Sequence, residues 1–188
     1  MNSYHSYQKI IYFILSFILV LILIYGGARH DYNLYTFTWE SFLNNEKEIP
    51  YNAYGPIHLL LSFIYKFHLL APKILFGFLF IVLNYHIFKK ILKKENKILL
   101  IYFYLTIHCN FLIISYIFFY GVNDTLVSFF LIISIILFIN QKFILSGTFI
   151  SIASLIKFYP ILFFPQFLFR NKKINVKILF VTVLFMAF

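Results

Sequence analysis

The fold is decided by one polar stretch set between apolar ones, residues 26–56, which read GGARHDYNLYTFTWESFLNNEKEIPYNAYGP. This stretch holds four of the six acidic residues in the chain: Asp31, Glu40, Glu46 and Glu48. The apolar run before it, residues 10–25, carries no charge and is nearly long enough to cross a bilayer. We therefore expect the polar stretch to lie just outside a membrane.

The composition of the remaining chain is that of a membrane protein. The 188 residues are 62% hydrophobic and only 12% charged, whereas soluble domains average about 45–50% apolar and about 25% charged residues. The formal charge of +10 comes largely from lysines at the ends of apolar runs, where they anchor spans at the cytoplasmic surface. The sequence predicts an all-α, polytopic helical membrane protein whose partners are membrane lipids and not nucleic acid.

We expect a single transmembrane domain over residues 1–188. Its predicted spans are residues 10–25, 74–88, 98–120, 125–139, 143–157, 160–169 and 176–188. A cleaved secretory signal is the alternative for the first of these. The last is too short to cross, because a span needs about 20 residues, so we expect the chain to be truncated.

The strongest topological signal is KKILKKENK, residues 89–97, whose five lysines and one glutamate belong in the cytoplasm. If the first span runs outward, residues 57–70 cannot cross as well. At about 14 residues they would form a helix of only ~21 Å, against a hydrocarbon thickness of ~30 Å. We therefore predict an interfacial helix over 57–70, inside an external loop of residues 26–73.

Two further segments fall on the external side of this topology. One is Gly121-Val122-Asn123-Asp124, and the other is the break from Lys157 to Pro160 in the apolar stretch 143–169, which we expect to form a V of two short helices. The single cysteine, Cys109, is expected to be an inert core residue. The six histidines show no metal-ligand spacing.

Three charged residues are candidates for chemistry. A carboxylate at Asp31, held among aromatics at a membrane surface, could gain a pKa suited to a general base; the alternative is a solvated loop acid. Asp124 either caps a helix or joins Asp31 on the same side. Lys157 lies within an apolar run, so it either lines a polar cavity suited to a phosphate or extends to the interface.

Three passages in order carry a resemblance to a known family. The first is Asp31-Tyr32 followed by the residues PYNAYGP at 50–56, the second is GVND at 121–124, and the third runs from SGT at 146–148 to KFYP at 157–160. The set resembles the GT-C superfamily of polytopic glycosyltransferases. The likeness is closest to the N-terminal part of bacterial polyprenol-phosphate-mannose-dependent mannosyltransferases, although position 122 is Val where Gln is common.

The resemblance implies a GT-C-like transmembrane module with juxtamembrane helices in the first external loop. It implies inverting transfer of a mannose-like hexose from a polyprenyl-phosphate-linked donor to a hydroxyl of a lipid or glycan acceptor, outside a bacterial inner membrane. Asp31 would be the general base, and Lys157 or Arg29 would stabilise the leaving phosphate. The resemblance also implies that no metal and no cofactor are needed. The remaining expected site residues are Asp124, which would orient the acceptor or the sugar, and His30, Tyr54, Asn123 and Tyr159.

Two other functions stay open on the sequence alone. One is a multi-span transporter or flippase-like protein, in which Asp124 and Lys157 line a path; such proteins show paired, interrupted helices in corresponding halves. The other is a truncated, non-catalytic remnant.

Overall fold

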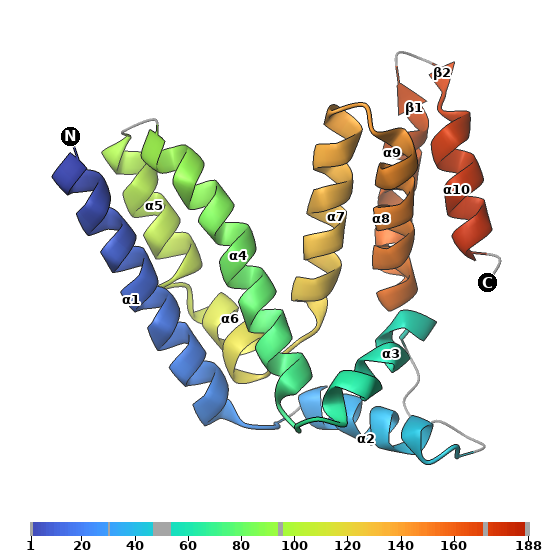
Figure 1. The fold of residues 1–188 in the computed structure, drawn as a ribbon, viewed down its shortest axis with the longest axis horizontal. Helices are drawn as coiled ribbons and strands as arrows, with labels where there is room; N and C mark the ends of the chain where they lie inside the picture. The colour runs from blue at the N-terminus through green and yellow to red at the C-terminus, as the bar shows by residue number, and fades with distance from the viewer. Residues whose placement is uncertain (1, 30, 47–53, 94–95, 171–172, 187–188) are drawn as a thin grey trace. The chain divides into compact units, whose positions relative to one another are not determined.

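A computed structural model describes residues 2–29, 31–46, 54–93, 96–170 and 173–186. The described chain is helical apart from one pair of two-residue strands (Figure 1). The elements are α1 (Asn2–Gly26), α2 (Asp31–Leu43), α3 (Pro56–Tyr65), α4 (Ala71–Lys93), α5 (Lys97–Ile107), α6 (Phe111–Ile113), the π-helix η1 (Ile114–Phe119), α7 (Asp124–Ile139), α8 (Phe143–Ile156), the 3-10 helix η2 (Tyr159–Phe163), α9 (Phe164–Leu168), β1 (Phe169–Arg170), β2 (Lys173–Ile174) and α10 (Val176–Met186).

These elements form two compact units. The first unit comprises Met1–Tyr35 and Phe67–Thr125, and the second comprises Thr36–Lys66 and Leu126–Phe188. Helices α2 and α7 therefore contribute residues to both units. Each unit is described below by itself, and the single transmembrane domain expected from the sequence stays a prediction.

Two described helices are long and apolar enough to cross a membrane by themselves. They are α1, over Tyr4–Gly26, and α4, over Ala71–Lys93, each of 23 residues. A third candidate is the pair Lys97–Ile107 and Phe111–Phe119, which is bent by 41°. The chain is therefore helical and of membrane type, as expected, whereas the crossings predicted over 125–139, 143–157, 160–169 and 176–188 stay predictions, because the helices there are shorter.

The first unit packs α1 against α4, α5 and η1. Near the lysine-rich end of α4, the Tyr12 ring stacks on Phe88 with centroids 4.7 Å apart, and its hydroxyl donates to the Ile81 carbonyl oxygen at 2.7 Å. At the other end of α1, Leu19 and Leu23 pack on Phe118 of the π-helix. Aromatic rings thus fill this core, and the hydroxyl of the buried Tyr12 is hydrogen-bonded to the backbone.

Helix α5 ends where the sequence had predicted an unbroken span over 98–120. His108 closes α5, and the Asn110 side chain accepts a hydrogen bond from the Leu112 amide at 2.9 Å, which caps the next helix. Asparagine is a preferred residue at helix starts, so the polar triplet His108-Cys109-Asn110 explains the bend. The expected burial of Cys109 is wrong, because this cysteine is exposed at the break.

The second unit holds α7, α8 and α10 together through small residues. The Ser134 hydroxyl donates to the Ser146 carbonyl oxygen at 2.8 Å, and the Ser146 hydroxyl donates back to the Ser134 carbonyl oxygen at 2.9 Å. The α-carbon of Ile178 lies 3.4 Å from the point where a Cβ would stand on Gly147. Close packing through serine and glycine is typical of helices in membranes.

The predicted break in the stretch 143–169 is confirmed. Helix α8 ends at Ile156, Lys157 is extended, and η2 begins at Tyr159 with Pro160 inside its first turn. The helix η2 packs against α8, and α9 then leads into β1 (Figure 1). The strand β1 then pairs with β2 in antiparallel register, Phe169 with Ile174, before α10 begins.

The loop expected over residues 26–73 contains two helices. Helix α2 begins at Asp31 and runs for 13 residues, and α3 runs for 10 residues from Pro56. The interfacial helix predicted over 57–70 is therefore shorter, because it ends at Tyr65 and Lys66–Leu70 are turns. Ten residues span only about 15 Å, so α3 by itself is too short to cross a membrane, and its interfacial position stays a prediction.

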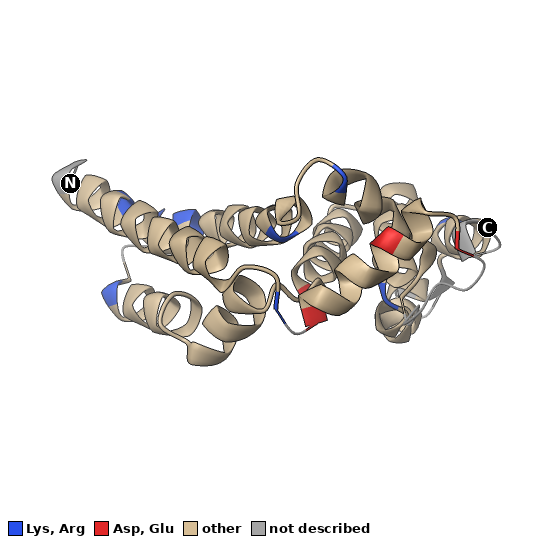
Figure 2. Ribbon diagram, turned by 90° about the horizontal axis from the view of Figure 1, so that it is seen from below, with Lys and Arg blue, Asp and Glu red and all other residues tan. Residues whose placement is uncertain are grey.

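Charged residues are sparse on the ribbon, as Figure 2 shows. The four described acids are Asp31 and Glu40 on α2, Glu46 just after it, and Asp124 at the start of α7. Lysines 89, 90, 93 and 97 gather instead where α4 ends and α5 begins, and all four are exposed. Asp31 and Asp124 are thus the first residues of their helices, and the lysines lie on other helices.

Candidate functional site

Asp31 is the first residue of α2, and its side chain is exposed. A carboxylate at this position is favoured by the unpaired amides and the dipole of a helix N-terminus. Asp31 thus agrees with the alternative of a solvated acid. Its role as a general base stays a prediction, because solvent exposure leaves it open to an acceptor hydroxyl.

Two tyrosines fix the first turn of α2 onto the first unit. The Tyr32 hydroxyl donates to the Leu69 carbonyl oxygen at 2.6 Å and accepts from the Lys73 amide at 3.3 Å. The Tyr35 hydroxyl donates to Asn123 Oδ1 at 3.3 Å. Both rings are buried, so the position of Asp31 is set by the residues that follow it.

Asn123 and Asp124 stand at the start of α7. Asn123 is fully buried, and its Nδ2 has no hydrogen-bond partner within the described part of the chain. Asp124 is half-buried and opens the helix, which agrees with the capping alternative. Asp31 lies one helical turn before Tyr35, and Tyr35 bonds the neighbour of Asp124. The two carboxylates that the sequence selected thus flank one tyrosine–asparagine contact.

Lys73 is a buried cation that sequence reasoning had treated only as the start of a span. Its Nζ donates to the carbonyl oxygens of Gly27 and Phe119, each at 2.7 Å, and the side chain is 0% exposed. Gly121, at φ +72°, lies against its stem, and a Cβ there would stand 2.8 Å from Lys73 Cγ. The sequence contains one sign that Lys73 is unusual. It is a lysine at the outer end of a predicted span, whereas lysines are expected at the cytoplasmic end.

Arg29 shares Phe119 with Lys73. Its guanidinium carbon lies 5.1 Å from the centroid of the Phe119 ring, and its side chain is exposed. Cation–π contacts at this distance hold an arginine without consuming its hydrogen-bond donors. The guanidinium group of Arg29, two residues before Asp31 in the sequence, can therefore donate hydrogen bonds to an anion.

Tyr54 and Lys157 are 103 positions apart in the sequence and meet in the second unit. Lys157 Nζ lies 5.5 Å from the Tyr54 ring centroid. Beside them, the Gly55 amide donates to the Ile156 carbonyl oxygen at 3.1 Å, which joins the start of α3 to the end of α8. The Lys157 side chain is half-buried, so a cation stands beside an aromatic face at a helix junction.

His58 and Trp39 complete this junction, and the sequence had not selected them. The imidazole of His58 lies 4.4 Å from the Tyr54 ring and 5.2 Å from the Trp39 ring between centroids. Trp39 Nε1 donates to the His58 carbonyl oxygen at 3.0 Å. Burial, and then the charge of Lys157, lowers the pKa of His58 to about 3, so the ring is neutral near pH 7.

Helix α2 is tied to α3 at the far end of the same junction. The Tyr65 hydroxyl donates to Glu40 Oε1. Burial, followed by this hydrogen bond and the charge of Glu40, raises the pKa of Tyr65 to about 12. The phenol therefore keeps its proton and stays a donor at physiological pH.

The remaining expected residues are less informative. Tyr159 is exposed at the first position of η2. His30 and the residues PYNA at 50–53 lie outside the described residues. Among the residues that are described, no group of three His, Cys, Asp or Glu side chains could hold a metal ion.

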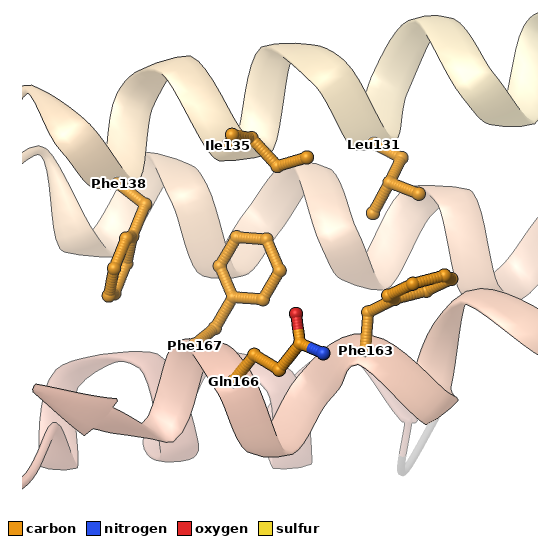
Figure 3. Close-up of a pocket in the computed structure, with 6 residues that line it drawn as sticks. All are labelled: Leu131, Ile135, Phe138, Phe163, Gln166 and Phe167. Atoms are coloured by element: carbon orange, nitrogen blue, oxygen red, sulfur yellow. The ribbon is translucent and has the colours of Figure 1, made fainter.

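The second unit also contains an apolar cavity of about 350 Å³ between α7 and the η2–α9 segment (Figure 3). Gln166 is the one polar side chain among those labelled there, beside Leu131, Ile135, Phe138, Phe163 and Phe167. With neither an acid nor a base in its lining, this cavity suits hydrocarbon and cannot perform proton transfer.

Comparison with protein-family models, with curated proteins and with solved structures finds no match. The assignment of a function therefore depends on the residues and contacts described above.

Proposed function

We propose that this chain belongs to a membrane glycosyltransferase that moves a mannose-like hexose from a polyprenyl-phosphate-linked donor to an acceptor hydroxyl on the extracytoplasmic side. One observation carries the proposal. The three sequence passages that resemble GT-C enzymes are joined pairwise: Tyr35, four residues after Asp31, bonds Asn123 of the second passage. Tyr54 and Gly55 of the first passage contact Lys157 and Ile156 of the third.

The residues divide into two chemical roles. Asp31 would take the proton of the acceptor hydroxyl as its oxygen attacks the anomeric carbon, which is general base catalysis. The bond from the anomeric carbon to the phosphate oxygen breaks, and the negative charge passes to the lipid phosphate. Arg29, two residues before Asp31 in the same unit, would stabilise that charge. Attack opposite to the departing phosphate inverts the anomeric centre.

The proposal is tested by transfer of radiolabelled mannose from polyprenyl-phosphate-mannose in proteoliposomes that contain the complete protein. Asp31→Asn should lower the rate by about 10²- to 10⁴-fold, the usual contribution of a general base. Glu46→Gln, the same change at an exposed acid just beyond α2, should leave the rate unchanged. Equal rates for wild-type protein and Asp31→Asn would remove Asp31 from the mechanism, and no transfer by the wild-type protein would end the proposal.

A transporter or flippase-like activity is the second candidate, and one observation favours it. Transporters carry interrupted helices in corresponding halves, and the sequence had suggested only the break at Lys157. The structure adds a second break at His108–Asn110, in the other unit. Movement of a labelled lipid-linked sugar across a vesicle membrane without hydrolysis or transfer would support this candidate over the enzyme.

A further inference from the structure

A groove in the first unit runs between α1 and α5, at the lysine-rich end. Its volume is about 390 Å³. Ile11, Leu100 and Ile101 line its apolar part, while Gln8, Tyr104 and Lys97 supply polar atoms. Helix α1 is a candidate membrane-spanning helix, and α5 is the first part of the bent candidate pair.

The polar end of the groove is formed by side chains that contact one another. The Tyr104 hydroxyl donates to the Gln8 carbonyl oxygen at 3.0 Å, which ties α5 to α1 across the floor. Lys97 Nζ lies 6.0 Å from the Tyr4 ring centroid, at the outer limit of a cation–π contact. Lys97 is exposed, and a contact with an aromatic face leaves its hydrogen-bond donors available to an anion.

The charge around this mouth is strongly positive. Lys89, Lys90 and Lys93 occupy the last turns of α4 and are exposed, and the segment of residues 89–97 contains five lysines and one glutamate. Each lysine close to a membrane surface attracts anionic lipid. A zwitterionic lipid would gain little from this field, because its own cation faces the same lysines.

We infer that the groove between α1 and α5 binds one acidic phospholipid, with its phosphate at Lys97 and an acyl chain along Ile101 and Leu100. An ammonium at the mouth of an apolar channel matches the two ends of such a molecule, and basic pockets between membrane helices are known to select acidic headgroups. This site is independent of the proposed glycosyl transfer, since it uses none of the residues assigned there.

The test is lipid retention. The complete protein is placed in nanodiscs of phosphatidylcholine with a minor fraction of phosphatidylglycerol and is then extracted in mild detergent. Mass spectrometry counts the phospholipids that stay bound. Wild-type protein should retain phosphatidylglycerol above its share of the bilayer, and Lys97→Gln should reduce that enrichment about fivefold, because the bound phosphate would lose its direct contact with an ammonium.

Two further variants separate the groove from general surface charge. Lys90→Gln removes the same charge from an exposed residue of α4 that does not line the groove, and it should keep most of the enrichment. Ile101→Trp keeps every lysine but fills the apolar part, and it should lose the bound lipid. Equal losses for Lys97→Gln and Lys90→Gln, full retention by Ile101→Trp, or no enrichment in the wild-type protein would each overturn the inference.

Discussion

Lys73 Nζ lies 2.7 Å from the carbonyl oxygen of Phe119 and donates a hydrogen bond to it. Phe119 is the last residue of η1, and the second acceptor, Gly27, follows the last residue of α1. Carbonyls at helix ends lack partners within their own helix. One ammonium from the first turn of α4 thus supplies donors to the ends of two other helices, and it fixes the chain from which Arg29 and Asp31 extend.

Replacing Lys73 with Met should destabilise the protein by about 1–3 kcal/mol, because two partly buried carbonyls would lose their donor. The apparent melting temperature in detergent, followed by loss of the monodisperse peak in gel filtration, measures the change. The control is Lys66→Met, at an exposed lysine after α3, which should stay within about 0.5 kcal/mol of the wild-type protein. Identical melting of all three proteins would show that the Lys73 contacts contribute nothing to stability.

Gly55 and Gly147 should respond oppositely to alanine. A Cβ on Gly55 would stand 2.0 Å from the Leu155 carbonyl oxygen, a backbone atom that cannot turn aside, whereas on Gly147 its nearest contacts are at 3.4 Å. We expect Gly55→Ala to cost at least about 1–3 kcal/mol through overpacking. Gly147→Ala lies within α8 and should be neutral or stabilise the helix by up to about 1 kcal/mol. The same melting assay decides, and a stable Gly55→Ala protein would contradict the α3–α8 junction.

The stability of the second unit should depend on pH through His58. In the unfolded chain this imidazole takes up a proton near pH 6.5, but in the folded unit its pKa is about 3. Between these values the unfolded state binds more protons, so the free energy of unfolding falls as the pH is lowered from about 6.5 toward 3. The slope should be on the order of 1 kcal/mol per pH unit at most.

The comparison for this prediction is His58→Gln against His86→Gln, the second at an exposed histidine on α4. Melting temperatures measured from pH 7 to pH 4 should fall less steeply in His58→Gln than in the wild-type protein. His86→Gln should follow the wild-type curve. If all three curves coincide, protonation of His58 is not what links pH to stability.

The helical regions could largely be predicted from the sequence, because long uncharged runs must satisfy their backbone internally within lipid. The residues at which the helices end were harder to predict. Helix α4 continues to Lys93 and not to residue 88, since lysine favours helix. The break at Asn110 was missed although asparagine is a frequent helix cap, because the apolar residues on both sides dominate any hydropathy window.

The candidate site could be predicted only in part. Asp31, Asp124 and Lys157 stand out as charges in an apolar chain, and that signal is local. The contacts of Lys73 with Phe119, and of His58 with Trp39 and Tyr54, join residues distant in sequence. Such pairings follow from how helices pack, which no single segment of sequence encodes.

Membrane topology is open to a direct test with two engineered cysteines. After Cys109, which is exposed, is replaced by Ser, a cysteine at Asn44 should react with a membrane-impermeant maleimide added outside intact cells. A cysteine at Asn96 should react only after the cells are opened, because it adjoins the lysines that belong in the cytoplasm. Reaction of both cysteines from one side would contradict the topology.

The π-helix η1 has one consequence for how this chain tolerates change in length. In a π-helix the hydrogen bonds join residues five apart, whereas in an α-helix they join residues four apart. A π segment therefore accommodates one added residue without disrupting the helix on either side. Deleting one residue from Ile114–Phe119 should therefore restore an ordinary α pitch at little local cost. The residues that follow should keep nearly their present direction, so the Phe119 carbonyl should still face Lys73, whereas the same deletion within an α-helix would rotate the next residues by about 100°.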